Sequence, residues 1–199
     1  MAVVEFFTVD GVRYMRNEAS FRDEFGMELV TDNEKKCVKE AYFNQVKLDE
    51  LEQNDLKDYI KYARWMGEYE KSKEVLIFAY EKYVYDESFV RMLMPMYVST
   101  CRHQIKEQFF NCGEEKIKEG KAQMDYVIND MRQVLKAYSF LETTEVYTSL
   151  LAAACDMIDL GKAKMFADKA VLLNGKAENR MLDAAIKRFL ELSKGYSLY

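Results

Sequence analysis

The scarcity of turn-forming residues constrains this sequence more than any other feature. Its 199 residues include one proline, Pro95, and eight glycines. Proline interrupts regular structure and glycine supplies many tight turns, so a chain with few of either favours long helices over a many-turned β fold. Hydrophobic residues make up 49% and charged residues 32% of the chain, as in a globular domain rather than a disordered one.

The first thirty residues follow a different pattern from the rest. β-Branched and aromatic residues stand on both sides of Asp10-Gly11, and Asp-Gly is a strong signal for a hairpin turn. We expect a small β-hairpin over residues 3–15, while residues 16–30 are ambiguous. A lone hairpin is marginal in water, so it should pack on the helices or on another chain, which would give a homodimer. The expected domains are 1–30, a hairpin with a linker, and 31–199, a helical domain.

Helical periodicity runs from residue 31 to residue 194. Capping residues mark the expected helix starts at Thr31, at Asn54 or Asp55, at Asp86 or Ser88, and at Thr143 or Thr144. The expected stops or hinges are Gly67, Gly113, Gly161 and Asn174-Gly175. Pro95 should kink or divide the helix that contains it. The glycines at 67, 113 and 161 are 46 and 48 residues apart, and each separates two helical patterns.

The stretch that follows residue 66 has a specific order of small and aromatic residues: Gly67, Tyr69, Ser72, Leu76 and Ala79. This order resembles the second half of a tetratricopeptide repeat (TPR). The stretch before Gly161 is similar to the first half of such a repeat, at Leu150, Ala153, Ala154 and Met157. The sequence departs from the family pattern at Ile60, Ala63, Val84 and Lys106.

The resemblance covers about residues 55–175 and implies an all-α fold. Antiparallel helical hairpins would stack as a short TPR-like α-solenoid beside the N-terminal β-hairpin. An unrelated helical bundle with glycine-terminated helices is the alternative. The resemblance also implies a non-enzymatic scaffold or regulatory module, in which the first helix of each hairpin lines a concave groove for a peptide or a partner helix.

We predict a binding surface on the helix that precedes Gly67. Its predicted residues, continued onto the next hairpin, are Lys57, Lys61, Arg64, Trp65, His103 and Glu107. The basic side chains would favour an acidic segment or a terminal carboxylate, and the tryptophan could anchor an apolar side chain. The alternative is a basic helix face that is only solvated.

Catalytic and metal-binding patterns are weak. His103 is the only histidine, and with Cys101, Cys112 and either Cys155 or Cys37 it could form a zinc site, but the spacing matches none of the usual zinc frameworks. No P-loop, GxGxxG, HExxH or GxSxG motif is present. We therefore expect no metal, no cofactor and no enzymatic activity, although a hydrolase or nucleic-acid enzyme on a helical scaffold stays open.

Charge and hydropathy bear on partners and location. The net charge of −5 argues against a dedicated nucleic-acid-binding domain, which is usually strongly basic. No apolar run approaches the ~18 residues of a membrane span, and the first nine residues contain no basic leader. Cys37 and Cys155 lie among helix-patterned residues, which predicts small buried thiols and a cytoplasmic location. A second functional alternative is a small inhibitor or immunity-type protein that blocks a target enzyme by covering its surface.

Overall fold

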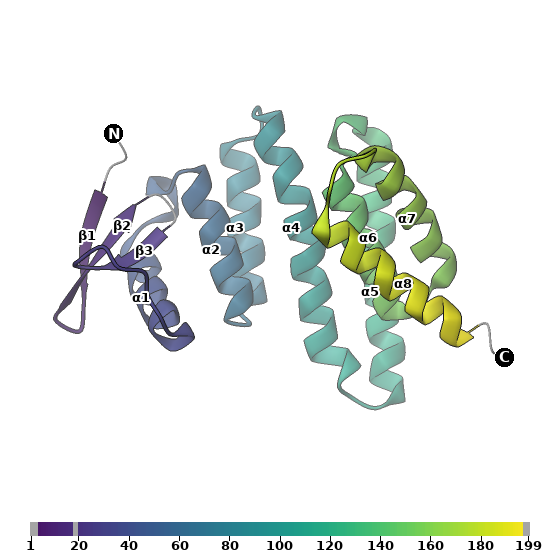
Figure 1. Ribbon diagram of the computed structural model, residues 1–199, viewed down its shortest axis with the longest axis horizontal. Coiled ribbons are helices and arrows are strands. Elements are labelled where there is room, and N and C mark those ends of the chain that lie inside the picture. Colours follow the sequence, from purple (N-terminus) through teal and green to yellow (C-terminus); the bar gives the residue numbers. More distant parts are fainter. Residues whose placement is uncertain (1–3, 18–19, 197–199) are drawn as a thin grey trace. The chain divides into compact units, whose positions relative to one another are not determined.

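The computed structural model describes residues 4–17 and 20–196. These residues form eight α-helices and one three-stranded antiparallel sheet (Figure 1). The expectation of a mostly helical chain with β structure near its N-terminus is therefore confirmed. The chain divides into two compact units, Met1–Lys82 and Tyr83–Tyr199, and this division lies elsewhere than the boundary after residue 30 that the sequence suggested.

The sheet of the first unit is built around the predicted turn. Its strands, in the order β1-β2-β3, are Val4–Val9, Val12–Asn17 and Ser20–Asp23. Asp10 and Gly11 have φ angles of 50° and 82°, the left-handed pair that a tight hairpin of the favoured hand requires. The hairpin is confirmed, except that its predicted first residue, 3, lies outside the described residues. The short strand β3 was missed in the segment that the sequence left ambiguous.

Three helices complete the first unit: α1 (Asp32–Gln45), α2 (Gln53–Trp65) and α3 (Tyr69–Lys82). The Thr31 hydroxyl accepts a hydrogen bond from the backbone N–H of Glu34, as predicted for the start of α1. The predicted cap of α2 at Asn54 or Asp55 is wrong. Glu52 is the N-cap, and the Asp55 side chain accepts a hydrogen bond from the Glu52 backbone in a reciprocal capping box.

Aromatic rings join the sheet of the first unit to its helices. Phe7 of β1 and Phe21 of β3 both contact the Tyr42 ring of α1, each with ring centroids 5.3 Å apart. Phe43 stacks on Tyr59 of α2 with centroids 4.2 Å apart. These contacts give the small sheet the apolar support that an isolated hairpin lacks.

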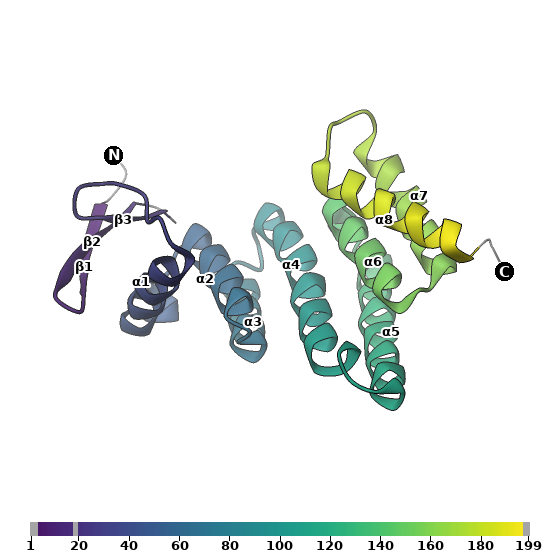
Figure 2. The same ribbon diagram turned by 60° about the horizontal axis from the view of Figure 1, so that its bottom comes forward.

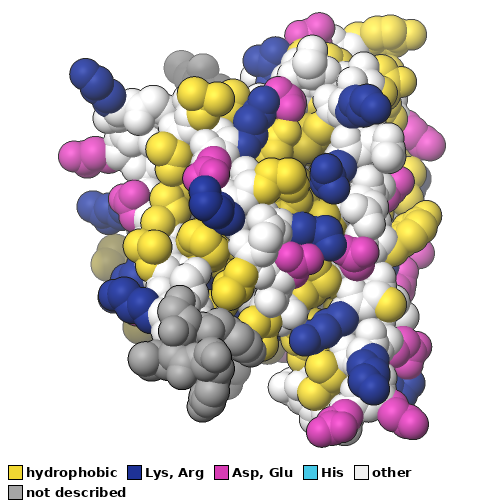
Figure 3. Space-filling view, turned by 90° about the vertical axis from the view of Figure 1, so that its right-hand side faces the viewer, with side chains coloured by type: hydrophobic (Ala, Val, Ile, Leu, Met, Phe, Trp, Pro, Cys, Tyr) yellow, Lys and Arg dark blue, Asp and Glu magenta, His cyan; other side chains and the backbone are white. Residues whose placement is uncertain are grey.

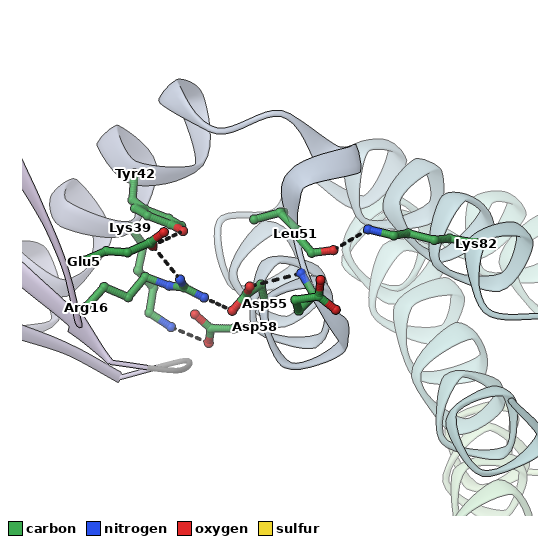
Figure 4. A network of polar contacts seen from close by, with 9 residues as sticks. Glu5, Arg16, Lys39, Tyr42, Leu51, Asp55, Asp58 and Lys82 are labelled. Atoms are coloured by element: carbon green, nitrogen blue, oxygen red, sulfur yellow. Dashed lines mark hydrogen bonds and ion pairs between the residues drawn. The ribbon is translucent and has the colours of Figure 1, made fainter. Parts of the chain in front are cut away.

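Ion pairs in the first unit accompany this aromatic core (Figure 4). Arg16 of β2 donates to the Glu5 carboxylate at 2.9 Å and pairs with Asp55 at the start of α2. The Tyr42 hydroxyl donates to the same Glu5 oxygen at 3.1 Å. Lys82, the last residue of α3, donates to the Leu51 carbonyl at 2.8 Å and so ties the α2–α3 hairpin to the segment before α2.

The second unit is entirely helical within the described residues. Its helices are α4 (Glu87–Ile105), α5 (Glu114–Ala137), α6 (Thr144–Met157), α7 (Leu160–Asn174) and α8 (Arg180–Tyr196). Helix α6 is central because it contacts α4, α5, α7 and α8 (Figures 1 and 2). Eleven of its fourteen residues are buried, as the broad apolar pattern of its sequence predicts.

One turn of the second unit differs from the sequence-based prediction. Helix α6 ends at Met157, and Ile158 takes the left-handed conformation with φ 61°, whereas Gly161 lies in the first turn of α7. The prediction that Gly161 ends this helix is therefore wrong. Helix α4 continues through Pro95, so the proline does not divide it.

A π-helical segment, Lys106–Phe110, extends α4 toward α5. It packs against Gly120 of α5, where an added Cβ would lie 2.5 Å from Phe109 Cβ. A glycine is required at this position because no side chain fits there. Segments of this kind are frequent at functional sites, and Lys106 takes part in one of the ion clusters described below.

Candidate functional site

A solvent-open groove of about 490 Å³ in the second unit is the largest candidate site that we describe. Helices α5, α6 and α7 form its walls, together with a linker residue that precedes α6. Its lining residues are Asn129, Arg132, Gln133, Leu135, Lys136, Glu142, Tyr147, Met165, Phe166 and Lys169. Of these side chains, three are basic and one is acidic, so the groove has an excess of positive charge.

Helical periodicity explains why basic side chains reach this groove. Met131 and Leu135 are buried on the core-facing stripe of α5, which leaves Arg132 and Lys136 exposed on the other side of the helix. Phe166 of α7 is buried at the base of the groove, and the Tyr147 ring centroid lies 6.3 Å from that of Phe166. The groove thus combines an apolar base with a basic rim.

A hydrogen-bonded triad fixes one wall of the groove. Glu142 accepts a hydrogen bond from the Tyr147 hydroxyl at 2.6 Å and another from Lys169 Nζ at 2.8 Å. The hydrogen bond from Lys169, followed by that from Tyr147, lowers the pKa of Glu142. Burial, followed by the hydrogen bond to Glu142, raises the pKa of Tyr147. Near neutral pH the carboxyl is ionised and the phenol is protonated, so the triad is suited to holding Lys169 in place rather than to moving protons.

A second charged cluster lies elsewhere in the same unit, around Asp156 of α6. Only 1% of this side chain is exposed. Arg102 Nε of α4 donates to it at 2.5 Å, Arg188 of α8 donates to its other oxygen, and Lys106 Nζ lies 3.4 Å away. Burial alone would raise the pKa of Asp156, but the hydrogen bonds and charges of Arg102 and then Arg188 hold it below its usual range.

Sequence reasoning missed both clusters as sites. The sequence did contain one sign of the cluster around Asp156, because this is the only charged residue within the apolar run of α6. A carboxylate at such a position requires partners, but their identity depends on which helices pack there. Arg132 and Lys136 were visible only as the polar face of a helix.

The predicted basic surface lies on α2 of the first unit. Lys61 is exposed, Lys57 and Arg64 are partly buried, and 42% of Trp65 is exposed. The Lys36 ammonium of α1 lies 4.8 Å from the centre of the Trp65 ring, so a cation already covers part of the expected anchor. The structure brings these α2 residues onto one helix, and their role in binding stays a prediction.

The other two predicted residues, His103 and Glu107, lie in the second unit. His103 is exposed on α4, with its Nδ1 2.7 Å from the Ser99 carbonyl oxygen, and Glu107 is exposed in the π-helical segment. Their role in binding also stays a prediction.

None of the four cysteines forms a disulfide. Cys155 is buried, as predicted, but Cys37 is exposed on α1, and that prediction is wrong because the buried stripe of α1 runs through Val38 and Tyr42 instead. Cys101 is buried and Cys112 is exposed. Across residues 4–17 and 20–196, the structure places no three His, Cys, Asp or Glu side chains where they could hold a metal ion.

The side of the molecule that contains α7 and α8 carries apolar side chains in patches between basic and acidic ones (Figure 3). Exposed apolar residues of these helices include Met165, Leu172, Met181 and Leu190. Within the described part of the chain, no helix has the length and hydropathy needed to cross a membrane.

Comparisons with known proteins find no relative, since no protein-family model, no curated protein and no solved structure matches this chain. The function proposed below therefore rests on the geometry of the two units and on the chemistry of their surfaces.

Proposed function

We propose that this chain is a non-enzymatic protein-interaction module that binds an acidic peptide segment in the groove between α5, α6 and α7. The observation that carries the proposal is the arrangement of Arg132, Lys136 and Lys169 around a base that contains Phe166. Basic groups above an apolar floor suit a segment with both carboxylates and an apolar side chain, because charge steers the encounter while apolar burial supplies affinity.

The state of the groove side chains supports binding rather than chemistry. Lys169 is held by Glu142, so less conformational freedom is lost when a ligand binds it. Arg132 and Lys136 are exposed and available at the rim. Met165 is 41% exposed, and methionine adapts its shape to different apolar partners.

The arrangement of helices is a further part of the proposal. The consecutive pairs α2–α3, α4–α5 and α6–α7 would be degenerate TPR-like units. The left-handed Gly67 and the buried Ser72 and Ala79 support this for the first pair, since they stand where the TPR pattern has its turn and its small residues. Such units would bind a peptide along their first helices, α2, α4 and α6, and of these only α6 lines the proposed groove.

The test uses fluorescein-labelled ten-residue peptides that share one leucine and differ in the number of glutamates. Fluorescence anisotropy would measure affinity for the full chain and for a double variant, Arg132→Glu with Lys136→Glu. We expect affinity to rise with glutamate number and to fall with added salt, and the double variant to bind the acidic peptides at least about tenfold more weakly.

The matched control is Lys57→Glu with Lys61→Glu, which makes the same charge change on α2 of the first unit. If the groove is the site, this control should bind the peptides as tightly as the parent does, apart from the general loss of affinity that the more negative net charge causes. A control that loses as much affinity as the groove variant would favour the α2 surface instead. Peptides that bind no better with glutamate than with glutamine would refute an acidic partner altogether.

A further inference from the structure

The cluster around Asp156 carries more positive charge than its carboxylate can neutralise. Arg102, Lys106 and Arg188 supply three cations to one buried carboxylate, which leaves a formal excess of two positive charges. Arg102 and Lys106 come from α4 and its π-helical extension and Arg188 comes from α8, so two separately packed elements deliver charge to one point. One of these cations would be enough to neutralise the carboxylate.

The two arginines have N–H donors that Asp156 does not use. Each contacts Asp156 through one nitrogen, Nε of Arg102 and one terminal nitrogen of Arg188. Within the described residues, both side chains form ion pairs with Asp156 alone. A guanidinium has five N–H donors, so each arginine retains donors for a second acceptor. Asp156 holds both groups in fixed orientation, which lowers the entropic cost of binding such an acceptor.

A pocket of about 250 Å³ adjoins the two arginines, and both contribute to its lining. Its other walls consist of Ala152 of α6 with Met181, Ala184 and Ala185 of α8, and of the hydroxyl-bearing Ser99, Thr148 and Ser149. An inorganic anion would leave the alanine and methionine side chains of these walls without a partner. A carboxylate attached to a short aliphatic group would match both the basic end and the apolar walls.

We propose that this pocket binds a carboxylate that carries a short aliphatic group, with Arg102 and Arg188 as the carboxylate-binding residues. The same chemistry occurs at the C-terminus of a polypeptide that ends in a small aliphatic residue and in a free short-chain acid. The site is distinct from the groove between α5, α6 and α7, so either site can fail without the other.

Isothermal titration calorimetry with defined probes tests the proposal. N-Acetylvaline represents a peptide terminus, isovalerate represents a free acid, and N-acetylvalinamide lacks the carboxylate. We expect at least one of the two acids to bind, and the amide to bind about tenfold more weakly or not at all, because it cannot form charge-assisted hydrogen bonds with the two arginines. Tighter binding of N-acetylvaline assigns the site to peptide termini, and tighter binding of isovalerate assigns it to free acids.

Arg188→Gln should weaken binding of the preferred acid at least about tenfold. Lys187→Gln is the matched control, because it removes the same charge from an exposed neighbour on α8 and should leave affinity unchanged. Arg188→Lys keeps the charge without the planar fork and should bind with intermediate affinity, which keeps the test valid if the glutamine variant unfolds. Circular dichroism would verify folding of all three.

Two results would overturn the assignment. One is the absence of heat for both acids with the folded parent chain. The other is inorganic phosphate binding more tightly than either acid, with equal loss for Arg188→Gln, which would show a general anion site without selection for an aliphatic group.

Discussion

Arg16 on β2 and Asp55 at the start of α2 form a buried ion pair that joins the sheet to the helices of the first unit (Figure 4). Asp55 has a second role, because its other carboxylate oxygen accepts a hydrogen bond from the Glu52 backbone N–H at 3.1 Å. One side chain therefore both begins a helix and neutralises an arginine of which only 7% is exposed.

We predict that Asp55→Ala destabilises the chain strongly. The substitution removes the buried one of the two carboxylates that pair with Arg16 and leaves only the half-exposed Glu5, which should cost ~1.5–3 kcal/mol, and it also removes half of the capping box. Urea unfolding followed by circular dichroism would measure the change. Asn54→Ala, at the exposed neighbouring position, is the control and should change the free energy of unfolding by less than ~1 kcal/mol. Equal effects of the two substitutions would contradict the role given to the pair.

A second prediction concerns the left-handed residue at the end of α6. Ile158 occupies the same kind of turn as Gly67, since the N–H of the next residue bonds back five positions in both, from Asp159 to Ala154 at 3.0 Å and from Glu68 to Ala63 at 2.9 Å. A left-handed conformation costs a side-chain-bearing residue ~1–2 kcal/mol. Ile158 is 39% exposed, so Ile158→Gly should raise the thermal midpoint slightly, whereas Gly67→Ala should lower it. A lower midpoint for Ile158→Gly would mean that its buried atoms outweigh the strain.

A third prediction compares two helical glycines. A Cβ at position 120 would lie 2.5 Å from Phe109 Cβ and 2.8 Å from Phe110 Cε1, so Gly120→Ala should displace the π-helical segment and cost ~1–3 kcal/mol. Gly195 of α8 has open space around it, and Gly195→Ala should be neutral or stabilising by up to ~1 kcal/mol. Unfolding midpoints in urea give both values. If Gly120→Ala stabilised the chain instead, the π-helical segment Lys106–Phe110 would have to move away from α5 at no cost.

A fourth prediction follows from the pKa of Glu142, which Lys169 and Tyr147 lower by hydrogen bonding. A carboxyl whose pKa is lower in the folded state adds stability above its unfolded pKa, near 4.5, and loses that stability as the pH falls through the folded value. The parent chain should therefore lose stability more steeply below about pH 4.5 than Glu142→Gln does. Thermal midpoints measured from pH 6 to about pH 3 would show the difference.

The control for the acid series is Glu178→Gln, at an exposed position between α7 and α8. Its pH profile should parallel that of the parent. A parallel profile for Glu142→Gln as well would mean that the triad with Tyr147 and Lys169 does not persist in solution.

Features encoded by neighbouring residues could be predicted from the sequence. The turn at Asp10-Gly11 and the caps at Thr31, Asp86 and Thr143 depend on side chains that act within four positions, and the structure contains all of them. The C-terminal stop of α7 at Gly175 is local in the same way.

Features that depend on packing could not be predicted. The chain reverses at Ile158 rather than at Gly161 because burial of α6 fixes where the helix ends, although isoleucine disfavours that conformation. Arg102 and Asp156 are 54 positions apart, and no periodic pattern relates them. The groove has the same origin, since Arg132 and Lys169 become neighbours only when α5 and α7 pack on either side of Tyr147.

The central position of α6 also bears on the order in which the second unit folds. Only two residues, Ile158 and Asp159, separate α6 from α7, so this pair closes the shortest loop and should form first. Asp156 should stay hydrated until α4 and α8 pack against α6, so its burial should be the last step in the folding of this unit. Substitutions at Ala163 of α7 should then alter the folding rate, while Arg188→Gln should alter mainly the unfolding rate. The ion cluster around Asp156 would thus form after the rest of the core has packed, and it would stabilise a unit that has already folded.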